Sequence, residues 1–342
     1  MRVLIVGATG VVGRQLVPQL IAAGDQVTAT TRRPDRMAGL RAAGADPLVL
    51  DGLDAGAVGE AVARIEPEVI VHEMTAIPAS LNMRKFEQTF AATNALRTAG
   101  LDNLLAAATA QGVRRVIAQS FAGWPNVRSG GPVKTEADPL DPDPPAAQRA
   151  TLDAIRYLEQ AVVAAPLEGL ALRYGGLYGP GASEVVVRML KRRQFPLVGG
   201  GTGVWSFLHV TDAASATVAA VHGGPPGVYN IVDDEPAAVA DWLPVLARGA
   251  GAPPPLRVPA WIGRLLAGEA GLSMMTQVRG CSNAKAKREL DWQLVWPSWR
   301  QGFAAGLAAA YPDARDAQDT RDGQDARDGQ DAREARAPRD PR

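Results

Sequence analysis

Residues 2–13 read RVLIVGATGVVG, an apolar run followed by three glycines at intervals of three. The run predicts a buried strand at Arg2–Val6, and the residues that follow have the apolar spacing of a helix. Gly7, Gly10 and Gly13 therefore lie between a strand and a helix. Glycines in this place allow a tight turn, close approach of the backbone to a pyrophosphate and close packing of the helix. The stretch predicts a dinucleotide-binding fold, with the free N–H groups and positive dipole end of the helix facing the phosphates.

Strands and helices alternate along most of the chain. Further strands are predicted at Gln26–Thr31, Pro47–Leu50, Val69–His72, Arg115–Ser120 and Leu170–Tyr174, and helices at Val11–Ala23, Arg36–Ala43, Ala55–Ile65, Lys85–Ala110 and Ala146–Ala164. Pro18 lies inside the first helix, where it removes a hydrogen bond and predicts a kink. Alternation with continuously apolar strands is typical of a parallel sheet covered on both faces. We therefore predict an α/β fold, a Rossmann-type doubly wound parallel sheet.

The predicted domain organisation follows from where this alternation holds. Residues 1–180 are expected to form the NAD(P)-binding domain, and residues 206–234 return to it. Residues 181–205 and 235–311 are mostly of helical period, so they predict a small, mostly helical C-terminal lobe that contacts the substrate.

The end of the chain has a different composition. From Asp313 to Asp331 an aspartate recurs at every third residue, and no apolar face accompanies it. Such a segment cannot offset its ordering entropy by burial. Residues 312–342 are therefore predicted to be a disordered Asp/Arg-rich tail.

Composition restricts the class of protein. The formal net charge is zero, so no electrostatic footprint indicates a nucleic acid or an anionic membrane as partner. Cys281 is the single cysteine, which excludes an internal disulfide and fits a reducing compartment. The sequence has no run of about 18 apolar residues, the length of a transmembrane helix. These observations predict a cytoplasmic protein that acts on a small molecule.

The end of the second predicted strand indicates which dinucleotide fits. An acid there would bind the ribose 2′-hydroxyl of NAD, but the chain reads Thr30, Thr31, Arg32, Arg33, and the first acid is Asp35. A guanidinium group matches a 2′-phosphate in geometry and charge. We therefore predict that Arg32, together with Arg33, selects NADP, with NAD as the alternative cofactor. Two solvated surface arginines are the other interpretation.

In their order along the chain, several motifs over residues 1–310 resemble the extended and atypical branch of the short-chain dehydrogenase/reductase family, the epimerase/dehydratase-like proteins. GATGVVG is similar to the family's glycine loop. TNALRTAGLDNLL, with Asn94, resembles its Asn-x-x-Gly helix, although Arg97 replaces the glycine, and RVIAQS places Ser120 like the active-site serine. Further similarities are LRYGGLYGPG (172–181), FLHVTD (207–212, in which Asp212 is expected to cap the next helix) and VYNIVDDEP (228–236).

The resemblance implies the residues of the site. The expected cofactor-binding residues are Gly7, Thr9, Gly10, Val11, Val12, Gly13, Arg32, Arg33, Asp51, Gly52, His72 and Arg173. Asp51 stands where the family often places an acid near the adenine, and His72 where the chain passes the cofactor. The expected catalytic residues are Ser120, Tyr178 and Asn94. No metal is expected, because the zinc-like start at His72-Glu73 lacks its second histidine.

The chain departs from the family at its tyrosine–lysine pair, in which the tyrosine exchanges the proton and the lysine lowers the pKa of the tyrosine. Counting back from Glu159, which resembles an acid of the family's helix, matches the tyrosine to Thr151 and the lysine to Ile155. Nowhere in the sequence does a lysine follow a tyrosine by four residues. Carbonyl reduction needs a proton as well as a hydride, and a positioned donor contributes roughly 10²–10⁴-fold to the rate. If hydride transfer occurs, another residue must donate.

The substrate is expected to be small and fairly apolar. Nucleotide-sugar members of the family commonly have an asparagine before the Tyr-Gly-Pro-Gly turn, whereas this chain reads Gly175, Gly176, Leu177. The C-terminal lobe contributes side chains that either line a cleft or form the core of the lobe, namely Trp205, Phe207, Trp242, Trp261, Met274 and Met275.

Together these patterns predict an NADP-dependent oxidoreductase or epimerase/dehydratase-like enzyme for a small carbonyl or hydroxyl compound. Ser120, Tyr178 or Tyr174 would supply the proton, and packing of both tyrosines in the core is the alternative. A redox-neutral dehydratase, isomerase or lyase and a non-catalytic NADP-binding sensor are the other functions considered. The long helices over 85–110 and 146–164 predict a homodimer.

Overall fold

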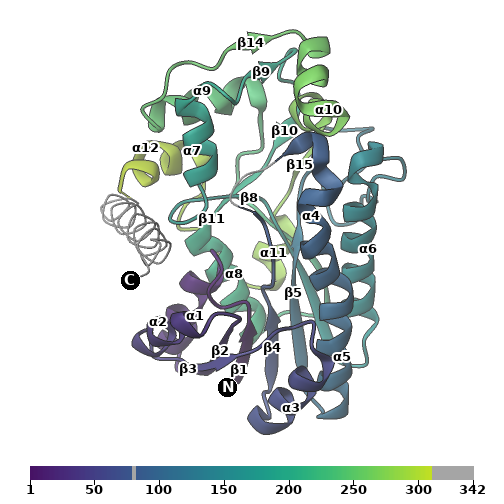
Figure 1. Ribbon diagram of the computed structural model, residues 1–342, viewed down its shortest axis with the longest axis vertical. Coiled ribbons are helices and arrows are strands. Elements are labelled where there is room, and N and C mark those ends of the chain that lie inside the picture. The colour runs from purple at the N-terminus through teal and green to yellow at the C-terminus, as the bar shows by residue number, and fades with distance from the viewer. Residues whose placement is uncertain (79–81, 310–342) are drawn as a thin grey trace, which may run out of the picture.

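The computed structural model describes residues 1–78 and 82–309, and its centre is a parallel sheet of seven strands (Figure 1). The spatial order is β12-β7-β5-β4-β1-β2-β3. These strands are β1 (Arg2–Val6), β2 (Gln26–Thr31), β3 (Asp46–Val49), β4 (Val69–His72), β5 (Arg115–Phe121), β7 (Glu168–Tyr174) and β12 (Gly227–Ile231). Every pairing is parallel and the order reverses beside β1, so the predicted Rossmann-type doubly wound sheet is confirmed.

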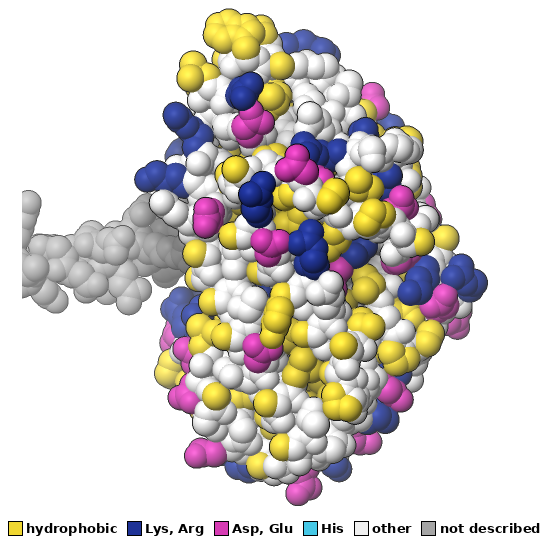
Figure 2. All heavy atoms as spheres, turned by 90° about the vertical axis from the view of Figure 1, so that its right-hand side faces the viewer, with side chains coloured by type: hydrophobic (Ala, Val, Ile, Leu, Met, Phe, Trp, Pro, Cys, Tyr) yellow, Lys and Arg dark blue, Asp and Glu magenta, His cyan; other side chains and the backbone are white. Residues whose placement is uncertain are grey.

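Helices cover both faces of the sheet (Figure 1). One face carries α1 (Gly13–Ala22), α2 (Met37–Ala42) and α8 (Val210–His222). The other carries α3 (Ala55–Ile65), α4 (Phe86–Ala95), α5 (Leu101–Ala110) and α6 (Arg149–Ala164), and a π-helical turn at Leu96–Gly100 joins α4 to α5. Figure 2 views the molecule from the side of α4 and α6 and shows hydrophobic side chains distributed among charged ones.

The strands are apolar throughout because both of their faces are covered. In β1, Val3 and Ile5 belong to the core under α1 and α8, whereas Leu4 and Val6 belong to the core under α3 and α5. This division follows from the two-residue period of a strand, which turns successive side chains to opposite faces. The unbroken apolar run at the start of the sequence therefore specifies a central strand.

The C-terminal part of the chain adds a separate aromatic core above the carboxyl ends of the strands (Figure 1). Its helices are α7 (Glu184–Lys191), α9 (Val239–Gly249), α10 (Ala260–Thr276) and α12 (Trp299–Ala309), while α11 (Ala284–Glu289) packs against β12. The short strands are β6 (Val133–Lys134), β8 (Gly176–Tyr178), β9 (Leu197–Val198), β10 (Val204–Trp205), β11 (Phe207–His209), β13 (Ala237–Ala238), β14 (Arg257–Val258) and β15 (Gly280–Cys281).

The prediction that residues 181–205 are mostly helical is wrong. Only α7 is helical there, and β9 and β10 pair with β14 and β13, which lie much later in the chain. Pairing over such a distance leaves no signal in the local periodicity. The helix-cap prediction for Asp212 is also wrong, because its carboxylate accepts from the N–H groups of Val295 and Trp296 at 2.9 and 2.8 Å, and Nδ1 of His209 caps α8 instead.

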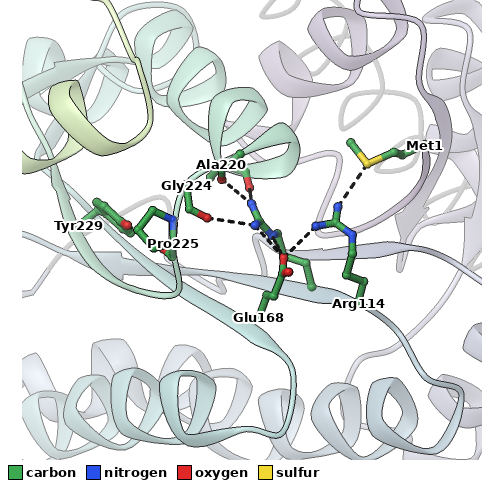
Figure 3. Close-up of polar contacts among 9 residues, drawn as sticks. Met1, Arg114, Glu168, Ala220, Gly224, Pro225 and Tyr229 are labelled. Atoms are coloured by element: carbon green, nitrogen blue, oxygen red, sulfur yellow. Dashed lines mark hydrogen bonds and ion pairs between the residues drawn. The ribbon is translucent and has the colours of Figure 1, made fainter.

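A buried arginine fixes the edge strand β12. Arg115, the first residue of β5, donates to the carbonyl groups of Ala220 (2.5 Å) and Gly224 (3.0 Å), and it lies 2.7 Å from the Glu168 carboxylate. Figure 3 shows these contacts at the end of α8. Carbonyl groups at the end of a helix carry partial negative charge, which the guanidinium group satisfies. The network holds the connection from α8 to β12 at the amino ends of the strands, away from the glycine loop.

No helix within the described ranges is both long and apolar enough to cross a membrane. Nor do three or more His, Cys, Asp or Glu side chains of this part of the chain gather as a metal site. The predicted Asp/Arg-rich tail, residues 312–342, lies outside the described residues.

Candidate functional site

The glycine loop connects β1 to α1 at the carboxyl edge of the sheet. Gly7 has a φ of +102°, which disfavours residues with a Cβ, and a Cβ there would lie 2.6 Å from the backbone of Glu73. A Cβ on Gly13 would lie 2.5 Å from the carbonyl oxygen of Ala8, so the start of α1 packs directly on the loop. The two glycines therefore let the loop pack against neighbouring backbone more closely than a residue with a Cβ would allow.

The amino end of α1 is suited to an anion. Within the described residues, the backbone N–H groups of Thr9, Val11 and Val12 donate to no carbonyl group, and the helix begins at Gly13. Free N–H groups and the positive end of the helix dipole together bind phosphate groups. The residues after β1 therefore fit the diphosphate of a dinucleotide.

A pocket of about 250 Å³ opens beside this loop. Five of the predicted cofactor residues line it, namely Gly7, Thr9, Gly10, Arg32 and Gly52, together with Val6, Thr30, Thr31, Leu50, Glu73, Met74, Thr75 and Leu96. The strand order reverses at this edge of the sheet, which is where open α/β sheets bind ligands. The loop offers N–H groups to phosphates, and Leu50, Met74 and Leu96 form an apolar wall for a flat base. Together these features fit a nicotinamide dinucleotide.

The two arginines after β2 differ in their surroundings. Arg32 lines the pocket, and it takes part in no ion pair of the described chain. Arg33 points its guanidinium group to Asp35, with 2.6 Å between Nη2 and Oδ2. Asp51 is exposed, does not line the pocket, and accepts from the N–H group of Leu53 at 3.1 Å. Arg32 is therefore the arginine in position to contact a ligand in the pocket.

Ser120 and Arg173 belong to a buried polar cluster under α6. They are register partners on β5 and β7. Ser120 donates to Glu159 at 2.6 Å, and Arg173 binds both carboxylate oxygens of Glu159 at 2.7 and 2.6 Å. Burial opposes the charge of Arg173, but the hydrogen bond and charge of Glu159 outweigh it and raise the pKa of Arg173. Ser120 is 1% exposed and lines neither pocket, so its hydroxyl group is engaged within the protein rather than presented to a substrate.

Arg97 and His72 complete this cluster. Arg97 lies on the π-helical turn, is 6% exposed, and its Nε is buried without a hydrogen-bond partner among the described residues. Burial lowers the pKa of Arg97 to about 10, against the opposing charge of Glu159. Burial also lowers the pKa of His72, whose Nε2 lies 3.0 Å from the carbonyl oxygen of Leu96. The carbonyl group only accepts, so Nε2 of His72 carries the hydrogen of this contact, and the lowered pKa favours the neutral ring.

The positions matched to the family's tyrosine and lysine lie inside α6. Thr151 and Ile155 are both buried, and the Asn94 Nδ2 donates to the Thr151 Oγ1 at 3.1 Å. The Oδ1 of Asn94 is buried with no partner among the described residues. Asn94 and Thr151 are thus brought together, and neither carries an ionisable group.

Tyr178 is packed in the aromatic core of the C-terminal part. Its ring centroid lies 5.2 Å from those of His209 and Phe303, and the side chain is buried. Burial raises the pKa of Tyr178 far above its ordinary value, and its hydroxyl group has no partner in the described chain. Tyr178 lines neither pocket. Its position in the core is the alternative that the sequence analysis gave for this tyrosine.

A second recess, of about 10 Å³ and thus with room for about one water molecule, lies next to the carboxyl end of β5. It is lined by Phe121, Ala122, Gly123, Trp124, Gly176, Trp205, Ser206, Met274 and Val278. Of the apolar residues that the sequence assigns to the lobe, Trp205 and Met274 line the recess, whereas Trp242 is buried in the core and Trp261 is 69% exposed. The Ser206 Oγ is already bound to the backbone of Cys281, accepting its N–H at 2.9 Å. The recess therefore offers apolar and aromatic walls without an ionisable side chain.

Two residues that line the pockets, Phe121 and Glu73, were not predicted from the sequence as site residues. Phe121 follows Ser120 on β5, and alternation along the strand turns Phe121, not Ser120, to the recess. Glu73 entered the sequence analysis only as part of an incomplete zinc motif, yet it lines the larger pocket. A charged residue that directly follows an apolar strand was the available signal for Glu73.

Comparisons with known proteins agree with this geometry. Residues 3–232 match the model of the NAD dependent epimerase/dehydratase family. The chain is 44% identical over 309 residues to a 3-diazoavenalumate denitrifying reductase of a Streptomyces species, covering 88% of this chain and 99% of the relative. It is 27% identical over 267 residues to a 2-alkyl-3-oxoalkanoate reductase of Stenotrophomonas maltophilia, covering 74% and 77%.

Solved structures share the fold. A Thermus thermophilus UDP-glucose 4-epimerase in complex with NAD superposes with a TM-score of 0.69 at 22% identity, over 90% of this chain and 98% of the epimerase. The family match, residues 3–232, covers the glycine loop and every residue that lines the larger pocket. The chain belongs to the NAD dependent epimerase/dehydratase family, and it is an NAD(P)-dependent enzyme, an oxidoreductase or an epimerase.

Proposed function

We propose that this protein is an NADPH-dependent reductase of an aromatic substrate whose reducible group accepts a hydride without needing a proton, such as an aryl diazonium group. The observation that carries the proposal is that no ionisable side chain lines the described recess beside β5. The name of the Streptomyces relative, a denitrifying reductase of a diazo compound, supports the same substrate class.

The proposed reaction suits a recess whose lining side chains cannot donate a proton. When bound, the reduced nicotinamide supplies a hydride. An aryl diazonium group takes up this hydride at its terminal nitrogen to give an aryl diazene; the bond between ring and nitrogen then breaks, N₂ leaves and the hydrogen ends on the ring carbon. The added hydride balances the positive charge, so no acid is required. Aromatic side chains such as Phe121, Trp124 and Trp205 would stack on the ring and exclude water.

The same pocket supports NADP as the coenzyme. Arg32 lines the pocket at the end of β2, where a ribose 2′-group is expected, whereas Arg33 is engaged by Asp35. The N–H groups of Thr9, Val11 and Val12 would hold the diphosphate. Three predicted cofactor residues do not line the pocket, namely Asp51, His72 and Arg173. In this proposal they act on the cofactor only through other residues.

The test is turnover of two substrate panels with NADPH and with NADH. Aryl diazonium compounds should oxidise NADPH with release of one N₂ per NADPH, and simple ketones should react much more slowly because protonation of their alkoxide lacks a donor. A ketone rate equal to the diazonium rate would support the second candidate, the carbonyl reductase indicated by the Stenotrophomonas relative. Substrate conversion without coenzyme oxidation would indicate a redox-neutral enzyme.

Ser120→Ala should leave kcat/KM within about threefold of wild type, since the hydroxyl group does not reach the recess. It should lower the free energy of unfolding by roughly 1.5–3 kcal/mol, because a buried hydrogen bond to a charged group is lost. Phe121→Ala is the matched comparison on the neighbouring residue, whose side chain lines the recess, and its main effect should be a higher KM. A large loss of kcat in Ser120→Ala would restore Ser120 as a catalytic residue.

Two further parts of the proposal concern assembly and domains. We keep residues 181–205 and 235–311 as the substrate lobe, since Trp205 and Met274 reach the recess from it. We also keep pairing of two copies through the face of α4 and α6, where Tyr157 and Val163 are each 41% exposed. Sedimentation equilibrium of wild type and Val163→Lys tests the homodimer, which the lysine should dissociate.

A further inference from the structure

Glu73 is a buried acid in the wall of the coenzyme pocket. It directly follows β4, lines the pocket and is 4% exposed. Its Oε1 lies 2.8 Å from the hydroxyl oxygen of Tyr174, which lies 2.5 Å from the Oγ1 of Thr217. Thr217 in turn donates to the carbonyl oxygen of Ala213 at 2.8 Å. The Oε2 of Glu73 is buried without a partner among the described residues.

The surroundings of Glu73 favour its neutral form. The Tyr174 hydroxyl group, which is itself uncharged, donates to Oε1, and Oε2 has no partner among the described residues. A buried carboxylate without a cation beside it is costly, and binding a proton removes that cost.

We propose that Glu73 is a coenzyme-positioning residue that holds a proton while the pocket contains the coenzyme, and that loss of this proton weakens coenzyme binding. The proposal rests on the proposed function, which places a dinucleotide diphosphate beside the same loop. A protonated Glu73 leaves that wall of the pocket neutral. An ionised Glu73 adds a buried negative charge, poorly screened by water, to a pocket for an anion.

The titration behaviour of Glu73 agrees with these surroundings. Burial raises the pKa of Glu73 to about 8, against the opposing effect of the Tyr174 hydrogen bond. Burial and the charge of Glu73 raise the pKa of Tyr174 well above its ordinary value, so Tyr174 stays neutral. The pKa of His72 is lowered by burial, so His72 is already neutral at these pH values.

Within the described residues, the hydrogen bonds and ion pairs of the titratable groups on α1 and α8 are with residues other than Glu73. On α8, Asp212 accepts from the N–H groups that follow Leu294, and the Nε2 of His222 lies 2.9 Å from Asp25 at the far end of the helix. On α1, Arg14 donates to the carbonyl oxygen of Thr9. Glu73 is thus the lining residue whose charge changes near pH 8.

The experiment is a titration of NADPH binding by fluorescence over the range from about pH 6.5 to about pH 9.5, with wild type and Glu73→Gln. The amide oxygen of the variant can still accept from the Tyr174 hydroxyl group, and the amide cannot ionise. We expect the Kd of wild type to rise roughly tenfold through this range and that of Glu73→Gln to change less than about twofold. Asp241→Asn, which changes an exposed acid on α9 that does not line the pocket, should follow the wild-type curve.

Thr217→Val supplies a second, independent arm. Without the Thr217 oxygen, Glu73 is the one remaining acceptor of the Tyr174 hydroxyl group among the hydrogen bonds of the described residues, which favours the carboxylate, so the rise in Kd should begin at lower pH. The protein without coenzyme gives a third readout. A carboxyl group whose pKa is raised from 4.5 to about 8 in the folded state makes the protein less stable as the pH rises between these values. Glu73→Gln should lack this part of the decline in Tm.

The outcomes separate this inference from the proposed function. Parallel pH curves for wild type and Glu73→Gln, with tight binding in both, would overturn the role of Glu73 and leave the reductase proposal standing. Absence of NADPH and NADH binding in wild type at millimolar coenzyme would overturn the proposed function instead. An infrared band of a protonated carboxyl group that is present in wild type near neutral pH and absent from Glu73→Gln would support the inference without any coenzyme.

Discussion

Replacing Glu159 with alanine is expected to lower the free energy of unfolding by about 3–5 kcal/mol, and Tm by on the order of 10 °C. Glu159 binds Arg173 through both oxygens at 2.7 and 2.6 Å and accepts from Ser120 at 2.6 Å. Arg97 lies close enough to feel its charge and is itself buried. The variant would leave two buried guanidinium groups without their carboxylate. Urea denaturation followed by circular dichroism measures the loss.

The control for this variant lies on the same helix. Asp153 and Arg156 form an ion pair at 2.6 Å on the exposed face of α6, and Asp153→Ala should cost less than about 1 kcal/mol because water screens the pair. The double variant Glu159→Leu, Arg173→Met should recover part of the loss, since it removes one stranded charge together with its partner. Equal losses for Glu159→Ala and Asp153→Ala would show that the buried cluster does not depend on this carboxylate.

Arg32→Ala is expected to raise the Kd for NADPH by roughly 10–100-fold and to change the Kd for NADH less than about threefold. The physical reason is the loss of charge-assisted hydrogen bonds to a 2′-phosphate, worth roughly 1.5–3 kcal/mol. NADH lacks this phosphate, so the same guanidinium group has little to bind there. Fluorescence titration of both coenzymes measures the two constants in one preparation.

Arg33→Ala is the matched control for Arg32, since the two residues are neighbours. The Arg33 guanidinium group is engaged by Asp35 at 2.6 Å and does not line the pocket, so its removal should alter the Kd for NADPH less than about threefold. Arg32→Lys keeps the charge without the planar fork and should fall between wild type and alanine. Equal affinity of wild type for NADPH and NADH would end the assignment of Arg32 to a 2′-phosphate.

The fold could be predicted because its signals are local. The apolar run at Arg2–Val6, the glycine spacing after it and the repeated strand–helix alternation each act over a few residues, and the strands at Arg2–Val6, Gln26–Thr31 and Val69–His72 have the predicted bounds. Pro18 was expected to disturb the first helix, yet α1 is one helix from Gly13 to Ala22 with Pro18 inside it.

The site could be predicted only in part, because its side chains meet across the sheet. Ser120 was chosen by its place at the end of a strand, but which face it occupies depends on the register with Arg173 and on Glu159 of α6. The replacement of a family glycine by Arg97 is visible in the sequence, whereas its burial beside Glu159 is not. Likewise, no local pattern brings Tyr174 and Thr217 to Glu73.

The anchorage of Arg115 at the amino ends of the strands has an evolutionary consequence. Its guanidinium group secures the last strand through main-chain oxygens near Gly224 and through Glu168, at the amino ends of the strands. The recess lined by Phe121 and Trp124 lies at the opposite ends of the strands. Substitutions around these two residues can therefore accumulate during evolution without disturbing the contacts that hold the edge of the sheet.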